Sequence, residues 1–173
     1  MNLQNNKLIV KGAASGGTAS LGSWNGTTGI ITTQSDAQTA QSYLTTLAVA
    51  TADDIGRVGQ TFGGQTVATG DVLVMYTYAG DANLSGRINA DDYFQIDSSM
   101  NKPSSLVSYF HGDFNYDGKI NGDDYFLIDS NFSRQGAAFS TGALPEGISI
   151  VPEPTAAALL TVAATMALRR RRL

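Results

Sequence analysis

The sequence is poor in the side chains on which most catalytic sites and many metal sites depend. It has no cysteine and a single histidine among 173 residues, which excludes a disulfide framework and a thiolate metal site. One imidazole also makes a Ser–His–Asp arrangement implausible, and a surface or capping role is favoured for His111. Glutamate is confined to Glu146 and Glu153 near the end of the chain, whereas glycosidases need two carboxylates about 5–9.5 Å apart. The chain is therefore predicted not to be an enzyme.

Acidic residues are few, but they are concentrated in one segment. Of 15 acidic residues, nine lie in residues 81–129: Asp81, Asp91, Asp92, Asp97, Asp113, Asp117, Asp123, Asp124 and Asp129. Only Arg87, Lys102 and Lys119 are basic there. Carboxylates at this density repel one another unless a cation neutralises them. The segment is predicted to bind cations, and nucleic acid is excluded as a partner.

The segments before residue 79 predict a small β-rich module. Two runs rich in β-branched residues, 6–12 and 70–78, read as strands, and a weaker strand is expected near Ile30. Residues 35–51 are expected to form a helix, because Ser35 and Gln38 have capping-box spacing. In that helix Tyr43, Leu44, Leu47 and Ala48 would share one face. The first residues do not have the pattern of a signal peptide, so an upstream start or a longer parent protein is expected.

Residues 80–98, GDANLSGRINADDYFQIDS, return 32 residues later as GDFNYDGKINGDDYFLIDS. Each copy contains a twelve-residue stretch, here called loop one (residues 81–92) and loop two (residues 113–124). Their positions 1, 3, 5, 7, 9 and 12 have the spacing of a calcium loop of the EF-hand type, with Gly86 and Gly118 at position 6. The predicted ligands are Asp81, Asn83, Ser85, Arg87, Asn89 and Asp92 in loop one, and Asp113, Asn115, Asp117, Lys119, Asn121 and Asp124 in loop two.

Calcium takes about six to eight oxygen ligands, which short Asp and Asn side chains supply. Position 7 would contribute its backbone carbonyl, so Arg87 and Lys119 are expected to point outward. Ser85 either ligates through a water or merely fills the turn, which makes loop one the weaker site. Ile88 and Ile120, at position 8, are expected to pair the loops back to back. The alternative for both repeats is a pair of Asx-rich turns without metal.

A helix is expected to follow each loop. Tyr93, Ile96 and Met100 form an apolar stripe, and Tyr125, Ile128 and Phe132 repeat it. Phe94 and Phe126, like the two tyrosines, are expected in the core and between the helices rather than as sugar-stacking platforms. Asp97 and Asp129 are expected on the solvated helix faces.

No amphipathic helix precedes loop one, so each unit is a loop followed by a helix. This pattern, with Asp at position 12, resembles the dockerin type I family over about 55 residues of the chain. The resemblance implies two Ca2+ ions and a secreted module that docks onto a cohesin-like or other surface protein in polysaccharide-degrading systems. Positions 10 and 11, Ala90, Asp91, Gly122 and Asp123, depart from the Ser/Thr-type residues that such modules often carry for partner choice.

The end of the chain is a distinct tail after a Gly/Ala/Ser-rich linker at 134–150. It combines Pro152-Glu153-Pro154, an apolar run at 155–168 that is expected to form a short helix, and four arginines, Arg169, Arg170, Arg171 and Arg172. Fourteen apolar residues are short for a membrane span of about 20 residues. The tail resembles the PEP-CTERM sorting signal, which implies export, transient membrane anchoring and processing by an exosortase. The alternative is an ordinary basic tail.

The expected class is thus α+β, with a β-rich module at 1–78, a dockerin-like domain at 79–133, the linker and the sorting tail at 151–173. The predicted function is a calcium-binding, non-catalytic docking module of an exported, surface-associated protein. The alternative is the C-terminal part of a secreted polysaccharide-degrading enzyme whose catalytic domain lies upstream. A calcium sensor is disfavoured, because its Met-rich groove does not match four scattered methionines.

Overall fold

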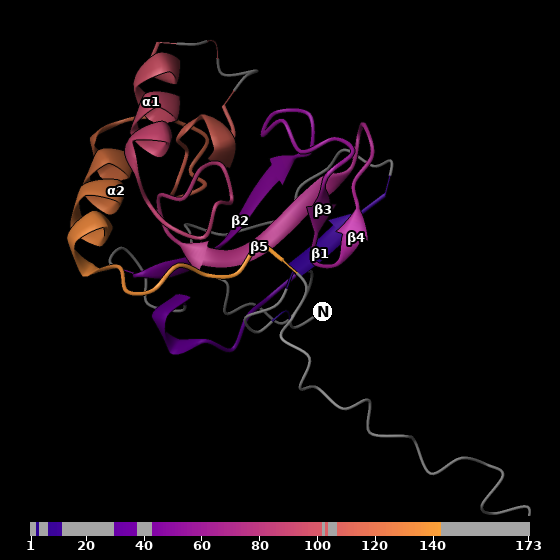
Figure 1. Cartoon of the computed structure of the whole chain (residues 1–173). Helices are drawn as coiled ribbons and strands as arrows, with labels where there is room; N and C mark the ends of the chain where they lie inside the picture. Colours follow the sequence, from indigo (N-terminus) through magenta and orange to yellow (C-terminus); the bar gives the residue numbers. More distant parts are fainter. Residues whose placement is uncertain are drawn as a thin grey trace, which may run out of the picture.

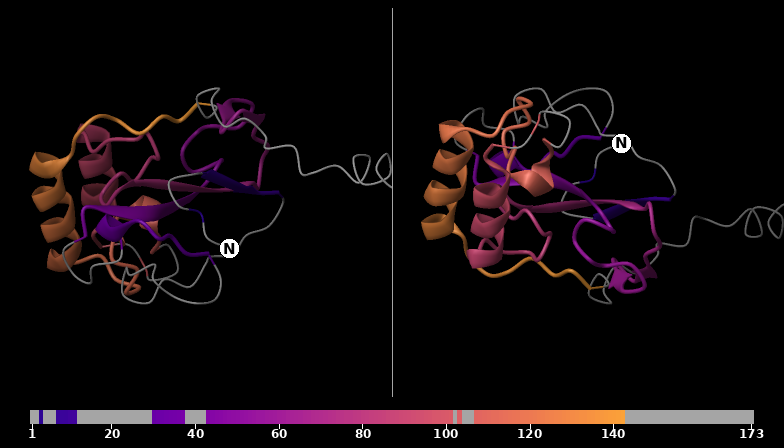
Figure 2. Two further views of the ribbon diagram at one scale, coloured as in Figure 1. Left: turned by 90° about the horizontal axis from the view of Figure 1, so that it is seen from below. Right: turned by 90° about the horizontal axis from the view of Figure 1, so that it is seen from above.

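The computed structural model describes residue 3 and residues 7–11, 30–37, 43–101, 103 and 107–142. They form the mixed α+β fold that the sequence predicts, with two helices beside each other at one end of a twisted sheet (Figure 1; Figure 2). The elements are β1 (Lys7–Val10), η1 (Ser35–Ala37), β2 (Thr45–Thr51), β3 (Thr61–Phe62), β4 (Gln65–Thr66), β5 (Val72–Tyr78), α1 (Ala90–Ser99), η3 (Tyr109–His111) and α2 (Gly122–Arg134).

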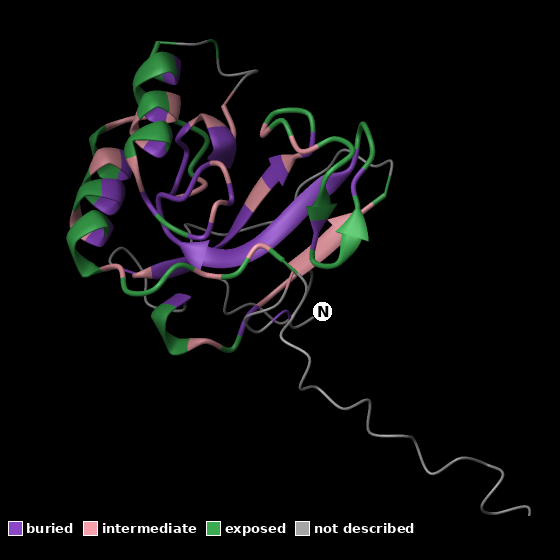
Figure 3. Cartoon of the chain, in the orientation of Figure 1, coloured by how far each residue is buried: buried purple, intermediate pink, exposed green. Residues whose placement is uncertain are grey.

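The main sheet is antiparallel, with the strand order β1-β5-β2. The strands predicted at 6–12 and 70–78 are confirmed as β1 and β5, and they pair with each other, Lys7 opposite Met75 and Val10 opposite Val72. All seven residues of β5 are buried (Figure 3). A strand covered on both faces reads as a continuous apolar run, which is why VLVMYTY was recognisable.

The helix predicted over residues 35–51 is wrong. Residues Ser35–Ala37 form one short 3-10 turn, and Thr45–Thr51 form β2, whose Leu47 pairs with Tyr76 of β5. Leu47 and Ala48, expected on one helical face, lie in different clusters on opposite sides of the sheet. The helical spacing was accidental, because a strand buried on both faces also carries apolar residues at adjacent positions.

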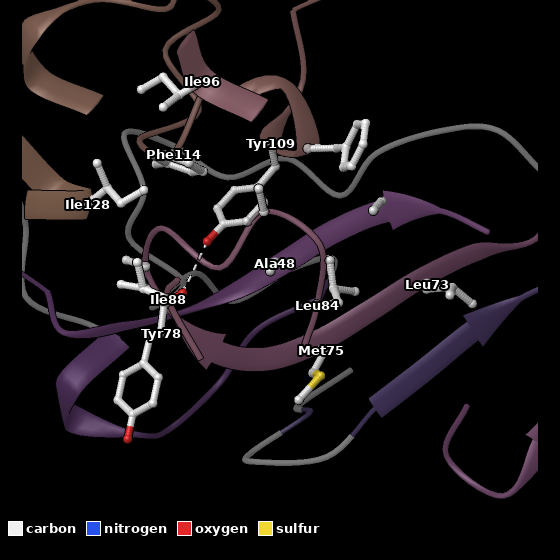
Figure 4. Packing of buried hydrophobic residues seen from close by; sticks show 14 of the residues in the cluster. Ala48, Leu73, Met75, Tyr78, Leu84, Ile88, Ile96, Tyr109, Phe114 and Ile128 are labelled. Atoms are coloured by element: carbon white, nitrogen blue, oxygen red, sulfur yellow. Dashed lines mark hydrogen bonds between the residues drawn. The ribbon is translucent and has the colours of Figure 1, made fainter. Parts of the chain in front are cut away.

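The larger hydrophobic cluster joins the sheet to the repeats. It contains Ala48, Leu73 and Met75 from the strands together with Ile88, Ile96, Tyr109, Phe114 and Ile128 from the repeated segment (Figure 4). The residues on both sides of the predicted boundary at 78/79 thus share one core. A smaller cluster, Leu3, Ala37, Leu47, Val74 and Tyr76, covers the other face of the sheet.

The two repeats are related by a crossed arrangement in which each loop packs on the helix of the other repeat. Gly80, just before loop one, adopts φ 118°, and a Cβ there would lie 3.0 Å from Ile128 of α2. Gly112, just before loop two, adopts φ 111°, and a Cβ there would lie 2.7 Å from Ile96 of α1. Both glycines are needed for their backbone conformation and for the close approach of the helices.

Candidate metal centre

The carboxylates at position 1 organise the turn of each loop. Asp81 accepts hydrogen bonds from the N–H groups of Ser85 at 2.9 Å and Gly86 at 2.8 Å, and from the hydroxyl of Thr77. Asp113 accepts the equivalent bonds from Asp117 at 3.0 Å and Gly118 at 3.1 Å. Both carboxylates are buried. The repeated sequence therefore gives the same local fold twice, with position 1 on the inside.

The carboxylates at position 12 tie each loop to its helix. Asp92 and Asp124 are both fully buried, and each completes a capping box with the position-9 asparagine, Asn89 or Asn121. In loop two, Asp124 also accepts from the N–H of Phe114 at 2.8 Å. Aspartate at the third helical position suits the helix N-terminus, where N–H groups lack intrahelical partners.

The side chains at positions 3 and 5 bond to the backbone of their own loop. The side-chain oxygens of Asn83 and Asn115 accept from the N–H at position 5, at 3.0 Å and 2.9 Å. The Ser85 hydroxyl donates to the carbonyl of Arg87 at 3.0 Å, whereas Asp117 accepts from the N–H of Lys119 at 2.8 Å. Side chains of Arg87 and Lys119 are exposed, as predicted.

Position 4 was missed by sequence reasoning. Leu84 has φ 55° and Tyr116 has φ 60°, which are the positive φ values among non-glycine residues in the described part of the chain. Residues other than glycine reach the left-handed region only at a cost of roughly 1–2 kcal/mol. The side chains compensate by packing, since Leu84 is buried and the ring of Tyr116 stacks on Tyr109. Neither side chain is of a type that signals a left-handed residue in sequence.

Loop one brings two carboxylates together and loop two is more acidic, but neither forms a dense acidic cluster. Within the described residues, no group of three or more His, Cys, Asp or Glu side chains could hold a metal ion. Any ion held by these loops would therefore depend on amide and carbonyl oxygens as well as on carboxylates, and such mixed oxygen sets suit Ca²⁺.

Comparison of the chain with protein-family models, curated proteins and solved structures found no match. The residues themselves therefore carry every statement about the function of the two loops.

Burial raises the pKa values of the loop carboxylates. Desolvation raises the pKa of Asp81 to about 6 and that of Asp124 to about 6. Desolvation, followed by repulsion from Asp81, raises the pKa of Asp92 to about 7, and burial also raises the pKa of Asp113. In the described part of the chain, none of these four carboxylates forms an ion pair. The ion pair found there joins Lys11 and Asp71. The raised pKa values follow from this burial, which disfavours the charged form of a carboxyl group.

The metal-free chain is expected to be more stable at pH 5 than at pH 8. Carboxyls whose folded pKa is raised bind more protons in the folded state, so their contribution is lost as pH rises from about 4 to about 7. We expect the midpoint of thermal unfolding, followed by circular dichroism in chelator, to fall by about 5 °C or more over that interval. Saturating calcium should raise the midpoint at pH 7 and so reduce the fall. A midpoint that rises with pH in chelator would contradict the buried, unpaired state of these carboxyls.

The expected back-to-back pairing of the loops does not form through the backbone of Ile88 and Ile120. The N–H of Ile88 donates to Oε1 of Gln135 at 2.8 Å, and its carbonyl accepts from Nε2 of Gln135 at 2.9 Å. The side-chain amide of Gln135 therefore takes the place that the partner loop was expected to occupy. Ile88 is still buried in the core as predicted, and the half-buried Ile120 packs against the same core. Gln135 was missed because it lies outside the repeat.

The tyrosines at the start of the helices bridge the two repeats. The hydroxyl of Tyr93 donates to Asp129 at 2.8 Å, and that of Tyr125 donates to Asp97 at 2.6 Å. Asp97 and Asp129 are exposed, as expected. Phe94 and Phe126 are not in the core: they are 65% and 59% exposed. Each follows a tyrosine whose hydroxyl bonds to the other helix, and the phenylalanine ring itself stays in solvent.

The rest of the apolar stripe is only partly buried. Ile96 and Ile128 are fully buried as predicted, whereas Met100 and Phe132 are about half exposed. Phe132 and Met100 instead contact the tyrosine of the opposite helix, the ring of Tyr93 at 6.0 Å and the hydroxyl of Tyr125 at 3.6 Å. His111 lies in η3, where its Nδ1 is 2.8 Å from the Ser108 hydroxyl.

The predicted sorting tail, with Pro152, Glu153, Pro154 and the four arginines, lies outside the described residues, as does the expected helix at 155–168. In the part of the chain that is described, no helix has the length and apolar character needed to cross a membrane.

Proposed function

We propose that this chain is a calcium-binding, non-catalytic docking module of an exported, surface-associated protein. The observation that carries the proposal is the pair of carboxylates at positions 1 and 12, which are buried in each repeat and form no ion pair with any residue that the structure describes. Burying an ionised carboxylate alone is costly. Two such pairs at EF-hand spacing, each in a loop that also carries asparagine side chains at positions 3 and 9, favour one divalent cation in each loop.

The ions would act as structural elements rather than as catalysts. Asp81, Asn83, Ser85, Asn89 and Asp92, with the carbonyl of Arg87, would hold the first ion. Asp113, Asn115, Asp117, Asn121 and Asp124, with the carbonyl of Lys119, would hold the second. A bound cation neutralises the carboxylates, so its binding energy becomes folding energy. Loop two supplies Asp117 where loop one supplies Ser85, which favours tighter binding in loop two.

The docking role rests on the outer face of the two helices. Phe94 and Phe126 are exposed at equivalent places, and Asp91 and Asp123 are exposed one turn earlier. Exposed aromatic rings at matching positions suit a protein partner. A cohesin-like or other surface protein is the partner class that the dockerin resemblance implies.

Export and sorting are proposed from the tail sequence alone. The Pro-Glu-Pro motif, the apolar run and the terminal arginines resemble a PEP-CTERM signal, which would be read by an exosortase-type enzyme after transient membrane anchoring. Cleavage of the tail by such an enzyme would release the docking module at the cell surface.

Calcium titration of the full chain tests the metal proposal. The full chain is used because the loops share their core with β2 and β5. We expect two binding events by calorimetry, and a gain of helical signal when calcium is added to chelator-treated protein. Magnesium at the same concentration is the control, since it prefers a smaller, octahedral site. Absence of binding heat with an unchanged spectrum would mean that the repeats are Asx-rich turns.

A further inference from the structure

The segment after α2 is bonded to loop one along its length. Residues 135–141, here called the strap, were predicted to be part of a linker. Gln135 makes two hydrogen bonds to the backbone of Ile88, and the N–H of Phe139 donates to the carbonyl of Gly86 at 2.8 Å. The strap thus forms hydrogen bonds with the residues of loop one on both sides of Arg87.

The strap is also anchored to the sheet. The hydroxyl of Tyr78 accepts from the N–H of Gly136 at 2.9 Å and donates to the carbonyl of Ala137 at 2.9 Å. The ring of Phe139 packs against Tyr78, with centroids 4.8 Å apart, and against Tyr76 at 5.2 Å. The strap therefore connects β5 to the edge of loop one.

Gly86 is fitted to this contact. A Cβ at Gly86 would lie 2.0 Å from the carbonyl oxygen of Phe139, which no side chain tolerates. Gly118, its counterpart in loop two, has a similar φ of 83° but nothing within 4 Å of its Cβ position. In both loops the glycine at position 6 is required for its backbone conformation. Only in loop one is it also required because another segment, the strap, lies against it.

The strap fixes the peptide units around the predicted position-7 ligand. The carbonyl of Arg87 accepts from Ser85 within the loop at 3.0 Å, while the backbone groups of Gly86 and Ile88 are held by the strap. Loop two has no such support: within the described residues, no hydrogen bond reaches the backbone of Ile120. Loop one has the weaker predicted set of calcium ligands, and it is also the loop that the strap contacts.

We infer that the strap is a positioning element of the loop-one cation site, so that calcium binding at loop one and docking of the strap strengthen each other. This inference rests on the proposed calcium function. Coupling of this kind is reciprocal.

The test is a calcium titration of the full chain followed by the amide NMR signals of Gly86 and Gly118. These N–H groups donate to Asp81 and Asp113, so each signal reports its own loop. In Gln135→Ala we expect the midpoint at Gly86 to move to about tenfold higher calcium, from two lost hydrogen bonds. The midpoint at Gly118 should stay unchanged. Gln65→Ala, at an exposed glutamine of β4, is the control and should move neither signal.

A measurement on the unsubstituted chain keeps the inference testable if Gln135→Ala fails to fold. Calcium should slow hydrogen exchange at the amides of Ile88 and Phe139, which are bonded across the strap. Unchanged exchange there, or equal shifts of Gly86 and Gly118 in Gln135→Ala, would overturn the inference while leaving calcium binding in place. No response of either glycine in the unsubstituted chain would instead overturn the proposed function and the inference together.

Discussion

Asp124→Ala is expected to unfold the second repeat and to abolish calcium binding at loop two. The carboxylate accepts hydrogen bonds from the N–H groups of Phe114, Asn115 and Asn121, at 2.8, 3.2 and 2.9 Å. Alanine leaves these donors without partners in a buried place, at a cost of about 1–3 kcal/mol for each group that stays dry. We expect the free energy of unfolding to fall by about 3 kcal/mol or more, measured by urea denaturation in chelator. Adding Asp113→Ala should extend the loss to the first repeat, because the two share a core.

The neighbouring residue supplies the control. Asp123 is exposed in the same helical turn, so Asp123→Ala should cost about 0.5 kcal/mol through the helix dipole alone. Asp124→Asn separates structure from metal, because one accepting oxygen remains and the charge is lost. It should keep most of the stability in chelator and lose calcium binding at loop two. Equal stability of Asp123→Ala and Asp124→Ala would contradict the buried role of Asp124.

Gly112→Ala is expected to disrupt the contact between the repeats. A Cβ at this position would lie 2.7 Å from Cγ1 and 2.9 Å from Cα of Ile96, and the residue has φ 111°. A clash with the backbone of a helix cannot be relieved by a rotamer change, so α1 must move away from loop two. We expect the free energy of unfolding to fall by about 3 kcal/mol or more, measured by thermal or urea unfolding with calcium present.

Gly118→Ala isolates the steric part of this effect. Its φ of 83° imposes a comparable backbone cost, but its Cβ would meet nothing within 4 Å. The expected loss is about 1 kcal/mol. Gly80→Ala, whose Cβ would lie 3.0 Å from Ile128, should fall between the two. If Gly112→Ala and Gly118→Ala were equally stable, the crossed packing of loop two on α1 would be contradicted.

The local features of the repeats could be predicted because their causes are local. The twelve-residue loop spacing, the turn glycines and the helix that follows each loop depend on residues within a few positions of one another. The close approach of Gly80 and Gly112 to the opposite helices also left a signal, since both copies begin with glycine. The repeated glycine is visible in the sequence, but its reason, the close contact with a helix, is seen only in the tertiary structure.

The errors fall where the partner is distant in sequence. Residues 45–51 carry apolar residues at spacings that fit a helix as well as a doubly buried strand, and pairing with β5 decided between them. Phe94 and Phe126 were expected to be buried because they lie beside the apolar stripes of their helices. In the fold the stripes bury Ile96 and Ile128, and the two phenylalanines are exposed to solvent.

By itself, the sequence determined two oxygen-lined loops, each followed by a capped helix, beside a buried strand at 72–78. The tertiary structure decided which other segments contact those loops. The backbone of Ile88 is bonded by the side-chain amide of Gln135, which lies 47 positions away in the sequence. Likewise, the carboxylates at positions 1 and 12 are present in the sequence, but their burial arises only in the folded chain, where the repeats and the sheet share one core. Burial is set by the whole fold, and burial makes it costly to keep a carboxylate charged without a counter-ion.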